Sequence, residues 1–150
     1  MKTAQLPKVY LYRRIVLAKL FIDEHFGDPI DLTEIAGEAS FSKFHFIRQF
    51  KNIYGKTPHQ YLIGVRVEKA MTILKANKGV SETCYEVGFE SLGSFTVLFK
   101  KLVGLTPSAY LSQQQKIKAQ IFRFPLKFIP GCFAEKRGWK ENSNFQEISH

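Results

Sequence analysis

The sequence predicts an all-α fold in which two helix-turn-helix units are joined by one long helix and followed by an irregular C-terminal tail. Three observations support this prediction: the chain repeats itself, each copy has the start and stop residues of short helices, and no helix breaker interrupts the stretch between the copies. We expect residues 1–118 to form the double unit, with subdomains at about 11–56 and 78–118 and a linker helix at 57–76. Residues 119–150 form the expected extension.

The internal repeat has a period near 49 residues. When Ser42–Leu62 is aligned with Ser91–Leu111, nine of the 21 positions are identical, including two Phe, one Gly and a Thr-Pro pair. Two copies are too few for a solenoid, which needs at least three repeats to bury its core. The repeat therefore predicts a duplicated supersecondary unit.

The first unit is predicted to be helix, turn, helix. Asp31 followed by Glu34 is a capping-box pattern, which starts a helix that reaches about Glu38. Ser42 is the expected N-cap of the second helix, and Gly55 is the expected left-handed residue that ends it.

The predicted linker helix begins at Thr57, with Pro58 in its first turn. No further breaker occurs before Asn77 and Gly79, so about twenty residues can form one helix of roughly 30 Å. Successive major-groove segments on one side of DNA lie about 34 Å apart. This length suits a spacer between two DNA-contacting helices, although a long helix in any bundle would look the same.

The second unit repeats the start and stop residues of the first. We expect Ser81 and Ser91 to begin its two helices and Gly104 to end the second of them. Thr106 and Pro107 then begin a further helix, as Thr57 and Pro58 do in the first copy.

The second helix of the first unit has an apolar side and a basic side. At about 100° per residue, Phe46, Phe50 and Ile53 fall on the side that faces the core. Arg can bond guanine at two points, Lys can neutralise a phosphate and Phe can touch a thymine methyl. The opposite side therefore predicts DNA contact, with an ordinary solvated face as the alternative. It carries Phe44, Arg48 and Lys51, flanked by His45 and Ile47.

The equivalent helix of the second unit rebuilds the core side with Phe95, Phe99 and Leu102. Its outward side has few groups that can hydrogen-bond to bases. That side carries Leu92, Gly93, Ser94, Thr96, Val97 and Lys100. Lys100, Lys101 and the helix N-terminus can still hold phosphates. We infer that the first helix supplies most of the base discrimination.

Composition favours a polyanionic partner and excludes several other classes. Lys and Arg number 22 against 13 Asp and Glu, which gives a net charge of +9 at pH 7. No apolar run is long enough to span a membrane, and no secretory signal is recognisable, so we expect a cytoplasmic protein. Cys84 and Cys132 are too few for a disulfide framework, and the four His lack metal-ligand spacing. We expect no enzyme activity, no cofactor and no metal.

Two features allow more than one interpretation. Arg66 lies on the same line as Leu62, Ala70 and Leu74, so we expect it to be partly buried and paired with a carboxylate of Glu82, Glu86 or Glu34. The tail segment 121–133 is apolar with interspersed basic residues. It either folds back on the domain, which we favour, or docks a partner such as RNA polymerase or a membrane surface.

The sequence resembles the AraC/XylS family of bacterial transcription regulators. The stretch from Gly88 to Tyr110, GFESLGSFTVLFKKLVGLTPSAY, follows the family's pattern of GF, then F-x-x-x-F-K, then G-x-T-P-x-x-Y. The linker positions Tyr61, Leu62, Arg66, Ala70 and Leu74 are also similar, and the resemblance covers about residues 11–113. It implies seven helices, two of which contact double-stranded DNA, and a protein that usually activates transcription.

Position by position, the resemblance places base contacts on both recognition helices. They fall at Phe44, His45, Ile47 and Arg48 in the first, and at Leu92, Gly93, Ser94, Thr96 and Val97 in the second. For phosphate contacts we expect the helix starts and nearby lysines: Ser42, Lys43, Lys51, Ser91, Lys100 and Lys101. Thr83, Cys84 and Tyr85 depart from the family's usual packing sequence, so Tyr85 either points outward or is accommodated by a local rearrangement.

Only about ten residues precede the first expected helix, which leaves no room for a sensor domain. We therefore expect a stand-alone protein that binds DNA as a monomer, with RNA polymerase as a further partner and no membrane contact. A fragment of a longer protein is the competing explanation. A protein-interaction module that binds polymerase or another regulator without recognising DNA sequence is the alternative function.

Overall fold

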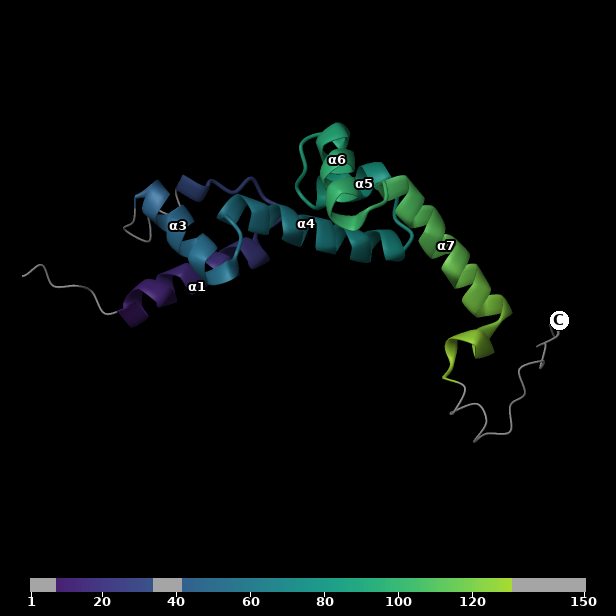
Figure 1. Ribbon diagram of the computed structural model, residues 1–150. Helices are drawn as coiled ribbons and strands as arrows, with labels where there is room; N and C mark the ends of the chain where they lie inside the picture. Colours follow the sequence, from purple (N-terminus) through teal and green to yellow (C-terminus); the bar gives the residue numbers. More distant parts are fainter. Residues whose placement is uncertain (1–7, 34–41, 131–150) are drawn as a thin grey trace, which may run out of the picture.

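The computed structural model describes residues 8–33 and 42–130, and these residues form helices and short connections without any strand (Figure 1). The expectation of an all-α fold is confirmed over this part of the chain. Its six α-helices are α1 (Lys8–Glu24), α3 (Lys43–Tyr54), α4 (Pro58–Lys75), α5 (Val80–Glu86), α6 (Leu92–Val103) and α7 (Pro107–Arg123). A short 3-10 helix, η1 (Pro125–Phe128), follows α7.

The described helices pack around two separate hydrophobic cores, one toward each end of α4 (Figure 1). The first core lies between α1, α3 and the first turns of α4, up to Leu62, and the second lies between α4 from Ile63 onward and α5, α6 and α7. α4 can serve both because its buried residues continue along the helix. They are Pro58, Leu62, Ile63, Val67, Ala70 and Leu74.

The helix ends follow the expected start and stop residues at most positions. Ser42 and Ser91 accept hydrogen bonds from the backbone N–H three residues later, and Gly55 and Gly104 end their helices at φ 72° and 89°. Only glycine adopts this left-handed backbone without strain. Thr57 caps α4 in a capping box with Gln60.

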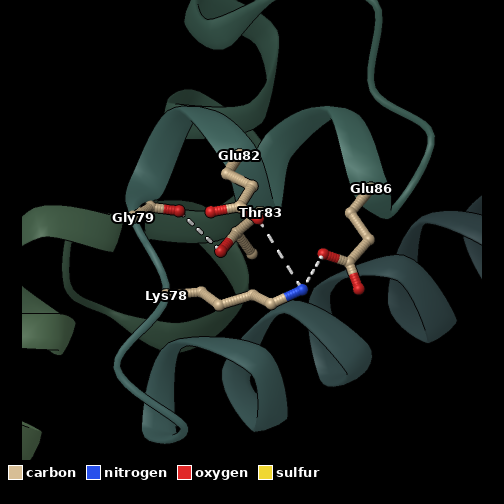
Figure 2. Close-up of polar contacts among 5 residues, drawn as sticks. All are labelled: Lys78, Gly79, Glu82, Thr83 and Glu86. Atoms are coloured by element: carbon tan, nitrogen blue, oxygen red, sulfur yellow. Dashed lines mark hydrogen bonds and ion pairs between the residues drawn. The ribbon is translucent and has the colours of Figure 1, made fainter.

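Two expected starts differ or lie outside the described chain. Ser81 does not cap α5, because the helix starts earlier and Gly79 is its N-cap without a side-chain bond. The Thr83 hydroxyl instead donates to the Gly79 carbonyl at 2.8 Å, as Figure 2 shows. In the first unit the Asp31 carboxylate accepts from the Thr33 N–H at 2.7 Å, as a helix start requires, but residues 34–41, with Glu34 and Glu38, are not described.

The apolar sides of α3 and α6 are shorter than predicted. Phe46, Phe50, Phe95 and Phe99 are fully buried, and they form the centres of the two cores. Ile53 and Leu102 were expected beside them but are exposed. Both lie in the last turn of their helices, where the chain turns away at a glycine. Angular position alone does not tell whether a neighbouring helix reaches that turn.

Arg66 is half-buried as expected, but its partners are not carboxylates. Its Nε donates to the carbonyl of Phe26 at 2.7 Å, and its Nη2 donates to the carbonyl of Asp28 at 3.0 Å. No described acidic residue lies within ion-pair distance of it. Burial lowers the pKa of Arg66, and the negative charge of Glu90 opposes this shift.

The two expected partners of Arg66 in α5 pair with another cation. Lys78 lies 2.8 Å from Glu86 and 3.8 Å from Glu82 (Figure 2), and the contact with Glu86 raises the pKa of the lysine. The third expected partner, Glu34, lies outside the described residues. The expectation was wrong for Glu82 and Glu86 because a planar guanidinium can satisfy its donors on main-chain carbonyls as well.

The C-terminal part of the described chain differs from the expected fold-back. α7 continues past Lys118 to Arg123, because no breaker occurs before Pro125, and Phe124 then leaves the helical conformation as a residue before proline does. The side chains of Phe122, Phe124 and Phe128 are 84%, 45% and 49% exposed, so they cover neither core. Residues 131–133, also part of the expected fold-back, are not described.

Candidate nucleic-acid interface

The outer side of α3 is exposed and basic. Because Phe46 and Phe50 anchor the inner side in the core, the residues on the opposite side of the helix point away from the molecule. Phe44 is 77% exposed, and Arg48 and Lys51 are also exposed. Lys43, in the first turn, is exposed as well. This side therefore offers one guanidinium, one ammonium group and an aromatic ring to a partner, and Lys43 adds a second ammonium group at the helix start.

The flanking positions of α3 are less accessible. Ile47 is half-buried and packs against the first core, so only part of its side chain faces outward. His45 is also half-buried, and its backbone N–H donates to the Ser42 hydroxyl at 3.3 Å. Ser42 accepts this bond and keeps its own proton for an outside acceptor such as a phosphate oxygen.

The outer side of α6 is largely apolar. Val97 and Leu92 are 67% and 40% exposed, and the position of a Cβ added at Gly93 has no neighbour within 4 Å. Lys100 and Lys101 are exposed in the last turns of the helix. The face can touch apolar groups at its centre and phosphates at its end.

The hydroxyls of α6 are partly occupied within the helix. The Ser91 hydroxyl donates to the Ser94 oxygen at 3.0 Å and accepts from the Ser94 N–H at 3.2 Å. The Thr96 hydroxyl donates to the Leu92 carbonyl at 2.8 Å. Ser94 therefore keeps a proton for an outside acceptor, whereas Thr96 offers only its lone pairs.

Charge is distributed unevenly along the chain. No Asp or Glu occurs between Ser42 and Val67 or between Ser91 and Ala134. All charged residues of α3 and α6 are therefore basic. In the described part of the chain, the ion pairs involve Lys19 and Lys78, and none involves the lysines of α3 or α6. The positive charges of these two helices are thus available to an anionic partner.

The structure places the two sets of predicted contact residues on separate helices, α3 in the first unit and α6 in the second, at different positions along α4 (Figure 1). Within each set some side chains point outward, such as Phe44 and Arg48 in α3 and Val97 in α6, and others flank this side, such as the half-buried Ile47. In the described part of the chain α3 packs on α1 and α4, and α6 packs on α4, α5 and α7, so a common partner of the two sets must extend from one unit to the other.

Sequence reasoning missed the contacts that join α1 to α4 in the first unit. The Tyr61 hydroxyl of α4 donates to Asp23 at 2.7 Å, and Lys19 lies 2.6 Å from the same carboxylate. Burial and the bond to Asp23 raise the pKa of Tyr61. The spacing of Lys19 and Asp23 indicates an ion pair on one helix, but nothing local links either to a tyrosine 38 residues away.

Other chemistry finds no support in residues 8–33 and 42–130. No group of three His, Cys, Asp or Glu there could hold a metal ion, and none of the helices is long and apolar enough to cross a membrane. Cys84 is buried, and burial raises the pKa of its thiol, which disfavours the reactive thiolate. Tyr85, beside it, is 60% exposed and points outward. Of the two arrangements expected for Tyr85, an outward side chain or a local rearrangement, the structure has the first.

Comparison with known proteins agrees with this geometry. The family described as "Helix-turn-helix domain" matches residues 35–113, just over half of the chain. The MmsAB operon regulatory protein of Pseudomonas aeruginosa is 34% identical over 91 residues, which are 60% of this chain and 30% of that protein. The chain spans between 30% and 55% of the length of three curated relatives that it matches.

Two solved structures have the same fold. The DNA-binding domain of AdpA, a global transcriptional factor, in complex with a target DNA has a TM-score of 0.63 and 28% identity. The match covers 74% of this chain and 96% of that domain. A probable AraC family transcriptional regulator from Rhodopseudomonas palustris has a TM-score of 0.63 at 20% identity, covering 68% of this chain and 97% of that one.

Proposed function

The chain belongs to the AraC family of helix-turn-helix transcription regulators, and we propose that it binds double-stranded DNA sequence-specifically with α3 and α6 in successive segments of the major groove. One observation carries the proposal. Two helices with matching caps and matching buried Phe pairs present outer sides that carry lysines and no acidic residue, from two units attached to the same helix. Phosphate neutralisation by such faces supplies affinity for any duplex.

The length of α4 supports simultaneous contact by both units. Its 18 residues correspond to roughly 27 Å of helix, and the units add their own width at each end. Segments of the major groove on one side of a duplex recur about every 34 Å. We infer that one monomer covers an asymmetric site of about two helical turns.

The two recognition helices have different tasks in this proposal. Arg48 pairs with a guanine and Phe44 touches a thymine methyl, while Lys43 and Lys51 hold phosphates beside α3. α6 offers mainly apolar contact through Leu92. Its further contact residues are Ser94 and Thr96 for bases, and Ser91, Lys100 and Lys101 for phosphates. The first unit therefore supplies most of the sequence discrimination.

The wider assignments rest on the same proposal. Residues 1–118 act as the DNA-binding domain, with 119–150 as an extension. We further propose, from the resemblance to a family that usually activates transcription, that the bound protein is an activator that contacts RNA polymerase.

Selection of bound sequences from a random DNA pool tests this function. We expect an asymmetric site whose most constrained bases fall in one segment. Arg48→Ala should cost about 1–3 kcal/mol at one base position, whereas Lys51→Ala should weaken binding to all sequences alike. Arg13→Ala, which removes an exposed cation from α1, is the control and should leave the profile unchanged. If Arg48→Ala leaves the base preferences unaltered, the assignment of α3 is wrong.

The exposed aromatic side chains of α7 and η1, Phe122, Phe124 and Phe128, favour a second candidate function. In it the protein binds another protein and does not recognise DNA sequence. A salt titration of binding to the selected site and to random DNA separates the two. Sequence-specific binding gives a footprint and a preference for the selected site in addition to a steep salt dependence. An interaction module gives weak binding that is the same for all sequences.

A further inference from the structure

The two units touch each other directly, away from the recognition helices. The loop after α1 contains Gly27, and the turn between α5 and α6 contains Gly88. A Cβ built on Gly88 would lie 2.9 Å from the carbonyl oxygens of Gly27 and Phe26, and one built on Gly27 would lie 3.2 Å from the carbonyl oxygen of Glu86. The two backbones therefore meet at a distance that leaves no room for a side chain at Gly88, and a side chain at Gly27 would require the opposite backbone to shift.

Arg66 of α4 lies at this meeting point. Its two hydrogen bonds hold the carbonyls of Phe26 and Asp28 in the loop of the first unit. Its Nη2 also lies 3.0 Å from the position of a Cβ on Gly88, and its guanidinium lies 5.9 Å from the ring centroid of Phe89. The Arg66 side chain thus contacts the loop after α1 in the first unit and the turn between α5 and α6 in the second unit.

Phe26 extends the same junction into both cores. It is the one partly buried side chain, among those described, that packs against the first and the second core cluster. The Lys69 ammonium lies 5.7 Å from the centroid of its ring, one turn of α4 beyond Arg66. Bending or twisting α4 between the units would have to break these contacts together.

We propose that Arg66 and the Gly27–Gly88 contact lock the orientation of α6 relative to α3, so that Arg66 is a positioning residue that sets which spacing of DNA segments the protein accepts. This inference rests on the proposed DNA-binding function. A single helix joining two units resists stretching but allows some bending and twisting, whereas a direct contact beside the helix opposes both. Arg66 acts on specificity without touching DNA.

The test measures affinity for DNA duplexes that differ only in spacing. The selected site is compared with versions that carry one base pair more or one fewer between the segments, each of which rotates one segment by about 35° relative to the other. A fourth duplex keeps only the segment bound by α3. We expect the wild-type protein to bind the duplex with the selected spacing at least about tenfold more tightly than the other two spacings. Loss of one set of base contacts lowers affinity by about this factor.

Arg66→Met keeps an apolar stem but removes both hydrogen bonds to the loop. The preference among the three spacings should fall below about threefold, while affinity for the single segment stays within about twofold of the wild type. Arg66→Lys, which can still reach one carbonyl, should fall between the two proteins. A role in stability alone would lower the melting temperature and leave the spacing preference intact, and that result would overturn the proposal.

A glycine pair supplies a matched control. Gly88 and Gly104 have almost the same left-handed backbone, at φ 91° and 89°, but a Cβ on Gly104 meets nothing within 4 Å. Gly88→Ala and Gly104→Ala therefore share the backbone strain, and only Gly88→Ala pushes the two units apart. We expect a flattened spacing preference for Gly88→Ala and an unchanged one for Gly104→Ala; equal behaviour would contradict the proposal.

Gly27→Ala keeps the test decisive if Gly88→Ala does not fold. Gly27 has an ordinary backbone, so alanine there adds the 3.2 Å contact with Glu86 without left-handed strain. A partial loss of spacing preference supports the proposal, and a full wild-type preference refutes it. Failure of the wild-type protein to prefer any sequence would instead refute the proposed function, which keeps the two failures apart.

Discussion

Two phenylalanines of α3, only six residues apart, should respond in opposite ways to the same substitution. Phe50 is fully buried, and its ring centroid lies 4.7 Å from that of Tyr54 and 5.6 Å from that of Tyr61. Phe50→Ala should lower the free energy of unfolding by about 3–5 kcal/mol, because the ring leaves a cavity that the packed neighbours cannot fill. A small domain has only about 5–15 kcal/mol in total, so this loss is a large fraction of it.

Phe44→Ala is the matched variant, because it makes the same chemical change in the same helix at a side chain that is 77% exposed. The gain in helix propensity is about 0.5 kcal/mol for Phe50→Ala, in the helix interior, and smaller for Phe44→Ala, in the first turn. For Phe44→Ala little else changes, so the free energy of unfolding should stay within about 0.5 kcal/mol of the wild type.

Urea unfolding followed by circular dichroism measures both effects, with the slope of the transition as a check that the unfolded state is unchanged. Binding to the selected DNA site should show the reverse order, because Phe44→Ala removes a proposed thymine contact and Phe50→Ala, where still folded, does not. The reasoning is refuted if Phe44→Ala destabilises the protein as much as Phe50→Ala does, or if Phe50→Ala costs less than about 1 kcal/mol.

Three further predictions concern the remainder of the fold. Tyr61→Phe should cost about 1 kcal/mol by removing the bond to Asp23. Since the pKa of Tyr61 is raised, the wild type should lose this contribution above about pH 10 and the variant should not, as thermal unfolding between pH 8 and 11 would show. Gly64→Ala, inside α4 with no neighbour within 4 Å of the new Cβ, should raise the free energy of unfolding by about 0.5–1 kcal/mol; a loss in urea unfolding would contradict this. In a Cys132→Ser variant, Cys84 should react with a thiol reagent only at the rate of unfolding; rapid reaction in native buffer would show that it is not buried.

Much of the fold could be predicted from the sequence because it depends on contacts near in the chain. An N-cap needs one oxygen three residues before a free N–H, so Ser42, Thr57, Ser91 and Thr106 indicate the correct helix starts. The Phe pairs four residues apart likewise fix the inner sides of α3 and α6.

The predictions that failed depend on contacts between distant residues. Arg66 was expected to find a carboxylate, but the groups that reach it are two carbonyls 38 and 40 residues earlier in the chain. Every residue has a carbonyl, so no sequence pattern marks which ones will be presented to a cation. The prediction that Ser81 begins a helix failed for a different reason. Gly79 can also begin a helix, and α5 starts there with Thr83 and Cys84 buried.

The candidate DNA contacts could be predicted only as a face, not as individual bonds. The outward direction of Phe44 and Arg48 follows from the burial of Phe46 and Phe50, which the repeat indicates. The half-burial of Ile47 depends on how closely the core approaches, and only the structure shows it.

The pattern of difference between the two copies argues for two unlike DNA segments. At inward positions the copies carry the same residue, Phe46 with Phe95 and Phe50 with Phe99, because each core accepts only a large ring there. At the outward positions proposed to contact bases the copies differ: Phe44 is matched by Gly93, and Arg48 by Val97, whereas the proposed phosphate contact Lys51 is matched by Lys100. A base-contacting face with a guanidinium and one that has valine at the same place cannot prefer the same bases. If the inward contacts hold both units in one orientation, the order of the two DNA segments also fixes the direction in which the protein lies on the duplex.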